Sequence, residues 1–445
     1  MGVGSLYCIG IQKGAGIFLA EGSRLFRRYC LYVSNFICYN LHENWVWLSL
    51  ARALDLGSRG RRFKSCHPDL QWWGKTTTYL IVLGGGVFSM KFVFGSSKTG
   101  NVTEALQTIQ APEALLFVVS DESMLADAAT QIEQAFPGVP SIGGVGQSYA
   151  GKVTVDQGIS VIGMKDQIKV AADVLEEASR IPAKYIRRLE DAFAAVDAQA
   201  GNTACYDLCS AGADLRAVTT LSSYMRPRGY ELAGGTSNSS AVACNGKVYK
   251  DACAFLVFKN LNGKIRAYKE NIYVHSAGEK QMMVTAADPK NYTMCTLDDV
   301  PAEEVYRASL GIGKEAMETQ TFKNPFGHVC DGDTYIVSIK EVDEQGNMVT
   351  FRPVNKMDFL TILELGDYRI VVGETVANLK EALGSVSAVL SVNCLFRYIM
   401  FGNDHYWNDY LATMSSSFAH AGMVGVGEHY NTQFVNQTMC CLAFE

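Results

Sequence analysis

The chain has 445 residues, of which 48% are apolar and 19% are charged, a composition that suits two or three domains with hydrophobic cores and excludes a disordered, fibrous or solenoid protein. The formal net charge of −6 argues against nucleic acid and anionic lipid as partners. The sequence contains no uncharged apolar run of about 18 residues or more, so we expect no transmembrane span and no membrane partner.

Residues 1–89 differ in composition from the rest of the chain. They hold ten Lys or Arg against four Asp or Glu, and four of the five tryptophans. They show neither the order of a signal peptide nor a sustained helical or strand period before residue 78. The stretch 50–69 resembles the peptide produced when a bacterial transfer-RNA gene is translated, and residues 83–86 can be encoded by a ribosome-binding site. We therefore expect residues 1–89 to be a mistranslated upstream segment and the native chain to begin at Met90.

The first predicted unit begins with an apolar run at 113–119, which indicates a buried strand. An amphipathic helix follows at 124–136 and ends at a Pro-Gly pair. A second strand leads into the turn 141–149, SIGGVGQSY, and a third strand is expected at 158–164. The turn contains three glycines, Gly143, Gly144 and Gly146.

The same order recurs near the C-terminus. There, a strand at 387–394, a helix from about 406 to 421, the turn 422–431 and a strand at 437–445 follow one another. A weaker middle copy has strands at 205–211 and 251–260 and a turn with Gly234 and Gly235. These copies predict an α/β fold of mixed sheets flanked by helices, built from two related halves with repeated βαβ-like units.

A polar, turn-rich linker at 286–299 separates the two halves. We place a domain boundary near residue 298, which gives one domain at 90–298 and another at 299–445. The turn and strand at 324–339 and the strand at 348–354 are expected to form a hairpin region in the second domain.

The glycine turn is not a phosphate loop. A dinucleotide fingerprint needs a third glycine and a following helix, but Tyr149 stands at the third position and a strand follows. A P-loop would need a Lys-Ser/Thr pair, which is absent. Two interpretations remain open: plain packing, and close approach of the backbone to a ligand.

The segment Cys394-x-x-Arg397 follows a buried strand, at the end where open α/β sheets place ligands. Arg397 can hold a carboxylate through two parallel hydrogen bonds, although a core thiol beside a surface guanidinium explains the pair equally well. Glu428, in the C-terminal glycine turn, can hold an amine. A nucleophilic Cys394 would need a base such as His405 or His429.

Nine cysteines follow Met90 without a CxxC pair or the spacing of a disulfide framework. Buried cytosolic thiols are the usual explanation of such a pattern. The segment 328–333 mixes soft and hard metal ligands, but a polar hairpin explains it better. We therefore expect no metal site.

Residues 90–445 contain several short motifs in a fixed order: PSIGGVGQSYAG, GYELAGGTSN, NPFG, VLSVNC-LFR and GVGEHYNTQFVNQT. With these motifs in this order, residues 90–445 resemble the FIST family. The resemblance implies an N-terminal FIST part and a C-terminal FIST part, in a bacterial stand-alone member. It implies an intracellular sensory module for a small ligand such as an amino acid, and, because no output domain is present, a chemoreceptor or kinase partner in trans. It also gives ligand-binding roles to Cys394, Arg397, Gly427, Glu428 and Asn436. Gln147 departs from the family pattern, which weakens the case for an acid in the N-terminal turn.

We therefore expect a cytoplasmic signal-transduction protein that is not an enzyme, uses no cofactor and binds a small polar ligand. The residues expected at the ligand are Arg397, Glu428, Cys394, Asn436, Tyr430, Gly427, Gly143, Gly144, Gly146, Gly234, Gly235 and Asn324. The alternatives are a cysteine-dependent hydrolase or transferase that uses Cys394, and an interaction scaffold with an exposed apolar patch.

Overall fold

The computed structural model describes residues 89–445 except 277–279, 331 and the side chain of 318, and it describes the backbone of five short strands before residue 89. The chain forms two compact units, Met1–Thr77 and Thr78–Glu445. In the first unit, four strands form an antiparallel sheet of order β2-β1-β3-β4: β1 (Leu6–Gln12), β2 (Ala15–Glu21), β3 (Ile37–Asn40) and β4 (Trp45–Val46). Most of residues 1–89 lie outside the part of the chain that the structure describes. The interpretation of this segment as a mistranslated upstream sequence therefore stays a prediction.

The first sheet of the second unit has the order β16-β15-β8-β7-β11-β6-β5. Its centre is a parallel pair, β7 and β8, joined by helix α4, and β11 lies antiparallel to both β7 and β6. The elements are β5 (Ile81–Leu83), β6 (Lys91–Ser97), α3 (Val102–Leu106), β7 (Ala114–Val119), α4 (Leu125–Ala135), β8 (Ser141–Val145), β11 (Ile159–Lys165), β15 (Ala241–Cys244) and β16 (Lys247–Lys250). The strand predicted at 113–119 is confirmed, and every residue of β7 is buried. The helix predicted at 124–136 is also confirmed.

The second sheet has the order β12-β17-β13-β14-β30-β31. Here β13 and β14 form the parallel pair, joined by helix α6, and β17 lies antiparallel to both β13 and β12. The elements are β12 (Ile168–Leu175), α5 (Ile186–Ala195), β13 (Thr203–Cys209), α6 (Asp214–Met225), β14 (Glu231–Thr236), β17 (Cys253–Asn260), β30 (Glu428–Tyr430) and β31 (Gln433–Val435).

The third sheet has the order β10-β9-β29-β28-β32-β18. Its parallel pair is β28 and β29, joined by two helices, and β32 lies antiparallel to both β28 and β18. The elements are β9 (Gln147–Ala150), β10 (Val153–Val155), β18 (Ile265–Asn271), α9 (Tyr368–Leu383), β28 (Ala388–Cys394), α10 (Leu395–Asn403), α11 (Trp407–Ser417), β29 (Ala419–Gly425) and β32 (Thr438–Phe444).

Each of these three sheets is completed at one edge by a hairpin from another part of the chain. After β8 the chain leaves the first sheet and forms β9 and β10 in the third. After β14 it leaves the second sheet and forms β15 and β16 in the first, and after β29 it leaves the third and forms β30 and β31 in the second. Gly146 and Gly427 therefore lie where the chain passes from one sheet to the next. The turns predicted at the other glycines are wrong, because these residues lie inside strands: Gly143 and Gly144 in β8, and Gly234 and Gly235 in β14.

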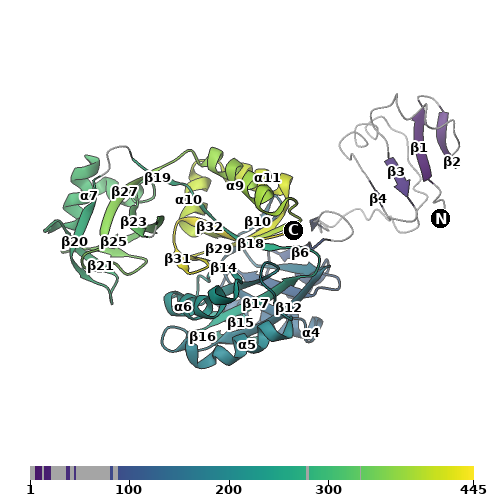
Figure 1. Cartoon of the computed structure of the whole chain (residues 1–445), viewed down its shortest axis with the longest axis horizontal. Coiled ribbons are helices and arrows are strands. Elements are labelled where there is room, and N and C mark those ends of the chain that lie inside the picture. Colours follow the sequence, from purple (N-terminus) through teal and green to yellow (C-terminus); the bar gives the residue numbers. More distant parts are fainter. Residues whose placement is uncertain are drawn as a thin grey trace. The chain divides into compact units, whose positions relative to one another are not determined.

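A further sheet is inserted between β18 and α9, and Figure 1 shows its strands grouped with α7, in green. Its elements are β19 (Tyr273–His275), β20 (Met282–Asp288), β21 (Thr293–Leu297), β22 (Val300–Pro301), α7 (Ala302–Leu310), α8 (Met317–Gln320), β23 (Phe326–Cys330), β24 (Asp333–Val337), β25 (Ile339–Val342), β26 (Met348–Thr350) and β27 (Phe359–Leu365). The predicted domain boundary near residue 298 falls in the turn between β21 and β22, which pair with each other in this sheet. The division into 90–298 and 299–445 stays a prediction.

The class of the fold is mixed α/β. The largest core cluster contains residues from all three hairpin-exchanging sheets, among them Leu116, Tyr206 and Leu390. Among the described residues, no helix is long and apolar enough to cross a membrane.

Candidate functional site

A small cavity lies at the carboxyl end of β28, where helix α10 begins. Its volume is ≈ 50 Å³, and it is lined by Ser338, Phe351, Cys394, Leu395, Phe396, Val426 and Asn436. Two of these residues, Cys394 and Asn436, were predicted as ligand-binding from the sequence. The Asn436 side chain is 2% exposed, and its Oδ1 atom has no hydrogen-bond partner within the described chain. The cavity wall therefore includes a residue with a buried, unpaired oxygen atom.

Glu428 lies behind the Cys394 wall of this cavity. Its Oε2 atom accepts hydrogen bonds from the backbone N and the Oγ1 of Thr438, at 3.0 and 2.7 Å, and the Cys394 thiol also contacts the carboxyl. Burial raises the pKa of Glu428 to about 7, although the hydrogen bonds from Thr438 act in the opposite direction. Burial and the Glu428 carboxyl together raise the pKa of the Cys394 thiol well above its usual value.

Arg397 does not line the cavity. Its guanidinium pairs with the carboxylate of Glu270 in β18, and both side chains are fully buried. The ring of Phe401 lies 4.6 Å from the guanidinium carbon, and the ring of Tyr410 lies 5.3 Å from it. The interpretation of Arg397 as a surface guanidinium is wrong, because the residue is 1% exposed. Its carboxylate partner in this structure is a residue of the chain itself, which sequence spacing did not reveal.

Two other predicted residues lie elsewhere. Tyr430 lines a groove of ≈ 340 Å³ beside the end of α6. Asn324 belongs to the inserted sheet, where its Nδ2 donates to the backbone oxygen of Leu363 at 2.8 Å. The structure thus brings together Cys394, Asn436 and Glu428, and it places Arg397, Tyr430 and Asn324 apart from their cavity.

The glycines of the turns are explained by contacts within the chain. A Cβ atom added to Gly143 would lie 2.2 Å from the Phe117 ring, and one added to Gly234 would lie 2.2 Å from Asp207. A Cβ atom added to any of the other four predicted glycines would also lie too close to a protein atom, at 2.6 to 2.8 Å: Gly144, Gly146, Gly235 and Gly427. Of the two open interpretations, packing against the protein's own atoms accounts for these positions.

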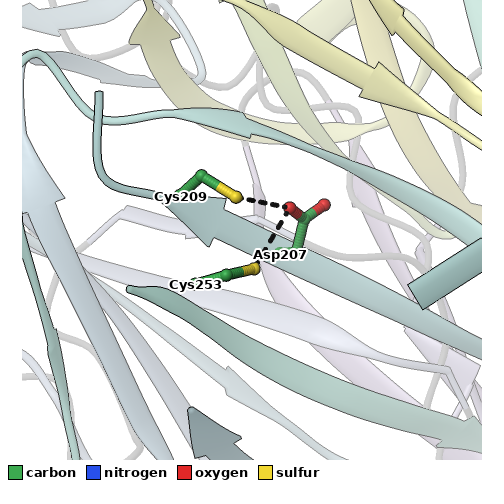
Figure 2. Close-up of side chains that lie close together, drawn as sticks. All are labelled: Asp207, Cys209 and Cys253. Carbon is green, nitrogen blue, oxygen red and sulfur yellow. Dashed lines mark hydrogen bonds between the residues drawn. The ribbon is translucent and has the colours of Figure 1, made fainter. Parts of the chain in front are cut away.

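A second buried polar centre was missed by the sequence reasoning, and Figure 2 shows three of its side chains. We call it the Asp207 cluster; it consists of Asp207, Cys209, Asp214, Cys253 and His429. The Asp207 Oδ2 atom accepts from the thiol of Cys209 at 3.5 Å and from the thiol of Cys253 at 3.6 Å. It also lies 2.6 Å from Nδ1 of His429.

Electrostatics keep the His429 ring charged. Burial lowers its pKa, but Asp207 and Asp214 outweigh burial and raise the pKa to about 10. One sequence signal could have found part of this cluster: the alternation in CYDLC, 205–209, places Asp207 and Cys209 on the same face of a strand. His429 could not be assigned to it, because it is 222 positions away along the chain.

These features define a mixed α/β protein with two buried polar centres, one at the carboxyl end of β28 and one on the second sheet. Residues 113–299 match the sequence model of the FIST N domain. The chain therefore contains a FIST N domain, a domain assigned to sensing in signalling proteins. The match extends from β7 to the start of β22, so the C-terminal FIST part and the bacterial origin stay predictions. A comparison with curated proteins finds no match.

Proposed function

We propose that this protein is a cytoplasmic sensory protein that binds a small polar ligand in the cavity beside Cys394 and Asn436. One observation carries the proposal: the cavity is walled by two residues singled out from the sequence, and one of them holds a buried oxygen without a partner. Buried polar groups are normally hydrogen-bonded, so the Asn436 Oδ1 atom is suited to accept a hydrogen bond from a ligand.

The size of the cavity limits the ligand class. A water molecule needs about 10–15 Å³ of such space, and the cavity offers ≈ 50 Å³. This is room for a molecule of a few non-hydrogen atoms. A small amino acid such as glycine or alanine fits this limit better than a large one.

The same wall supplies complementary groups for an amino acid. Leu395 and Phe396 are the first residues of α10, and both line the cavity. The positive end of the helix dipole favours an anion, so the ligand carboxylate would lie toward this end of α10, where the Phe396 backbone N–H already bonds to the Cys394 thiol. The ammonium group would donate to Asn436. In this arrangement the α10 N-terminus takes over the role first assigned to Arg397, which is paired with Glu270.

A binding role agrees better with the geometry than cysteine chemistry does. A nucleophilic cysteine needs a thiolate, whereas burial and Glu428 raise the pKa of Cys394. The candidate base His429 is bonded to Asp207 instead. Signalling would require a chemoreceptor or kinase partner in trans.

We also propose that the three hairpin-exchanging sheets derive from one repeated βαβ-like unit. Their strand orders correspond: β6-β11-β7-β8-β15-β16, β12-β17-β13-β14-β30-β31 and β18-β32-β28-β29-β9-β10. The parallel pair, the antiparallel third strand and the exchanged hairpin occupy the same places in each. This correspondence supports the internal repeat inferred from the glycine turns.

Differential scanning fluorimetry and calorimetry with single amino acids test the binding proposal. We expect glycine or alanine to raise the melting temperature, and a larger residue such as phenylalanine to have a smaller effect. Stabilisation should approach about 2.7 kcal/mol when the ligand is at 100 times its Kd. Asn436→Ala should abolish the shift, and Asn324→Ala, in the inserted sheet, should preserve it. Equal shifts for wild type and Asn436→Ala would refute the site.

A further inference from the structure

The Asp207 cluster brings three metal-ligating atoms around one point in the interior. The Sγ atoms of Cys209 and Cys253 and a carboxylate oxygen of Asp207 all lie within 4.8 Å of one another. Figure 2 shows both thiols directed at the same oxygen of Asp207. All three residues are fully buried. This convergence involves two sulfur atoms and one carboxylate, which is a donor set that zinc accepts.

The backbone explains why the two sulfur atoms meet. Cys209 and Cys253 are directly opposite each other in the antiparallel pairing of β13 with β17. Side chains at such positions have Cβ atoms about 4.5–5.5 Å apart. Asp207 precedes Cys209 by two residues and so lies on the same face of β13. The fold therefore fixes the three side chains without help from a loop.

The spacing of the donor atoms agrees with tetrahedral coordination. Bonds of about 2.3 Å to sulfur and about 2.1 Å to oxygen place a sulfur and an oxygen on the same ion about 3.6 Å apart. The two sulfur-to-oxygen distances in the cluster are 3.5 and 3.6 Å. The two sulfur-to-oxygen distances therefore already match those of ligands on one ion.

We propose that Cys209, Cys253 and Asp207 bind a thiophilic divalent metal ion of the zinc class. His429 is the positioning residue: its Nδ1 lies 2.6 Å from the Asp207 Oδ2 atom and holds that carboxylate toward the two sulfurs. The other carboxylate oxygen, Oδ1, is buried and has no hydrogen-bond partner within the described chain. Binding replaces two S–H bonds by two metal–thiolate bonds and releases two protons to solvent, without electron transfer.

A second set of donors in the cluster is less suitable. Cys209, Asp214 and His429 also lie within 4.8 Å of one another. This set offers a single thiol, and Asp214 already accepts a hydrogen bond from the Thr236 hydroxyl. The two sets share Cys209, and only the first contains Cys253, so substitution of Cys253 tests the assignment.

The experiment measures the metal content of the full chain, expressed in zinc-supplemented and in cobalt-supplemented medium. Mass spectrometry of the purified protein should find about one zinc ion per chain. The cobalt form should show thiolate-to-cobalt charge-transfer absorption in the near ultraviolet, with an intensity that corresponds to two thiolates. Cys209→Ser and Cys253→Ser should each lose the metal or halve this absorption. His429→Gln should weaken metal binding about tenfold to hundredfold, as loss of an outer-shell partner does.

A matched control separates ligand loss from loss of a buried thiol. Cys244→Ser removes another buried thiol, in β15, outside the cluster, and it should keep the full metal content and absorption. Wild-type protein that is folded by circular dichroism but holds no more metal than the Cys209→Ser/Cys253→Ser double variant would overturn the proposal. A metal-loaded protein whose absorption is unchanged by Cys253→Ser would overturn this ligand set. Neither result depends on the amino-acid cavity.

Discussion

Glu428 and His429 are consecutive residues of β30, yet they belong to different buried centres. The Glu428 carboxylate accepts two hydrogen bonds from Thr438 in the third sheet. The His429 ring lies against Asp207 in the second sheet. Successive side chains of a strand point to opposite faces, so a single short strand connects the cavity wall to the Asp207 cluster. A shift of β30 would therefore affect both centres.

Glu428→Ala should destabilise the protein by about 2–3 kcal/mol, because it leaves the backbone N–H and the hydroxyl of Thr438 buried without an acceptor. Glu428→Gln keeps an acceptor oxygen in place and should cost less. Urea unfolding curves of the two variants measure the difference. Glu341→Ala, at an exposed position of β25, should change the free energy of unfolding by less than about 0.5 kcal/mol. Equal losses for the Ala and Gln variants would show that the acceptor does not matter.

Gly234→Ala should destabilise the protein by about 1–3 kcal/mol, the range typical of overpacking. The new methyl group would lie 2.2 Å from both the backbone oxygen and the carboxylate of Asp207. Gly402→Ala is the matched control, because Gly402 lies in helix α10 with no atom within 4 Å of its added Cβ. It should be neutral or stabilise by up to about 1 kcal/mol. Thermal unfolding measures the change in stability of both variants. Equal changes at Gly234 and Gly402 would contradict the close approach of Gly234 to Asp207.

The buried pair of Arg397 and Glu270 predicts a double-mutant cycle with a large coupling energy. Arg397→Met or Glu270→Met alone should cost about 3–5 kcal/mol, because each leaves the other charge buried without its partner. The combined Arg397→Met/Glu270→Met variant should recover much of this loss. Additive losses would contradict the pairing seen in the structure. If Arg397 is structural, the folded double variant should also retain its stabilisation by amino acids.

His420 should contribute less to stability in acid, whereas Glu428 and His429, whose pKa values are raised, act in the opposite direction. This ring is fully buried, bonded to the Ser391 hydroxyl at 2.8 Å, and flanked by the rings of Tyr149 and Tyr410. Burial lowers its pKa to about 3 from an ordinary value of 6.5. Between these pH values the unfolded chain binds a proton at this ring that the folded chain does not, so the contribution of His420 to stability falls as pH falls. The loss from this group should be about 2 kcal/mol between pH 7 and pH 5.

Chemical denaturation at pH 7, 6 and 5 measures this effect. His420→Gln removes the titrating ring, so the change in the free energy of unfolding from pH 7 to pH 5 should be more favourable in the variant than in the wild type, by about 2 kcal/mol. A variant with the same pH dependence as the wild type would assign the acid sensitivity to other groups.

Local patterns in the sequence predicted local structure well. The apolar run at 113–119 and the helical period at 124–136 appear as β7 and α4. These signals are read from neighbouring residues, because burial on both faces of a strand or on one face of a helix leaves a short-range pattern. The position of Cys394 at the end of β28 followed from the same kind of reasoning.

The pairing of distant segments could not be predicted in this way. The partner of Arg397 is 127 positions away, and the partner of His429 is 222 positions away. Strand pairing depends on which edges meet in the folded chain, and alternation along one strand carries no information about its neighbour. For the same reason, the glycine turns suggested a ligand when their close neighbours are other strands of the protein.

The exchange of hairpins also has a consequence for biosynthesis. The edge of β14 is covered by β30, and the centre of the third sheet needs β32; both strands follow residue 427, long after the strands that they complete. While the ribosome is still attached, the nascent second sheet presents an open edge, which is a template for pairing with other chains. A fragment cut at residue 299, the end of the matched FIST N segment, would keep that edge open permanently. Such a fragment should aggregate where the full chain does not, and loss of only the final strands should have the same effect.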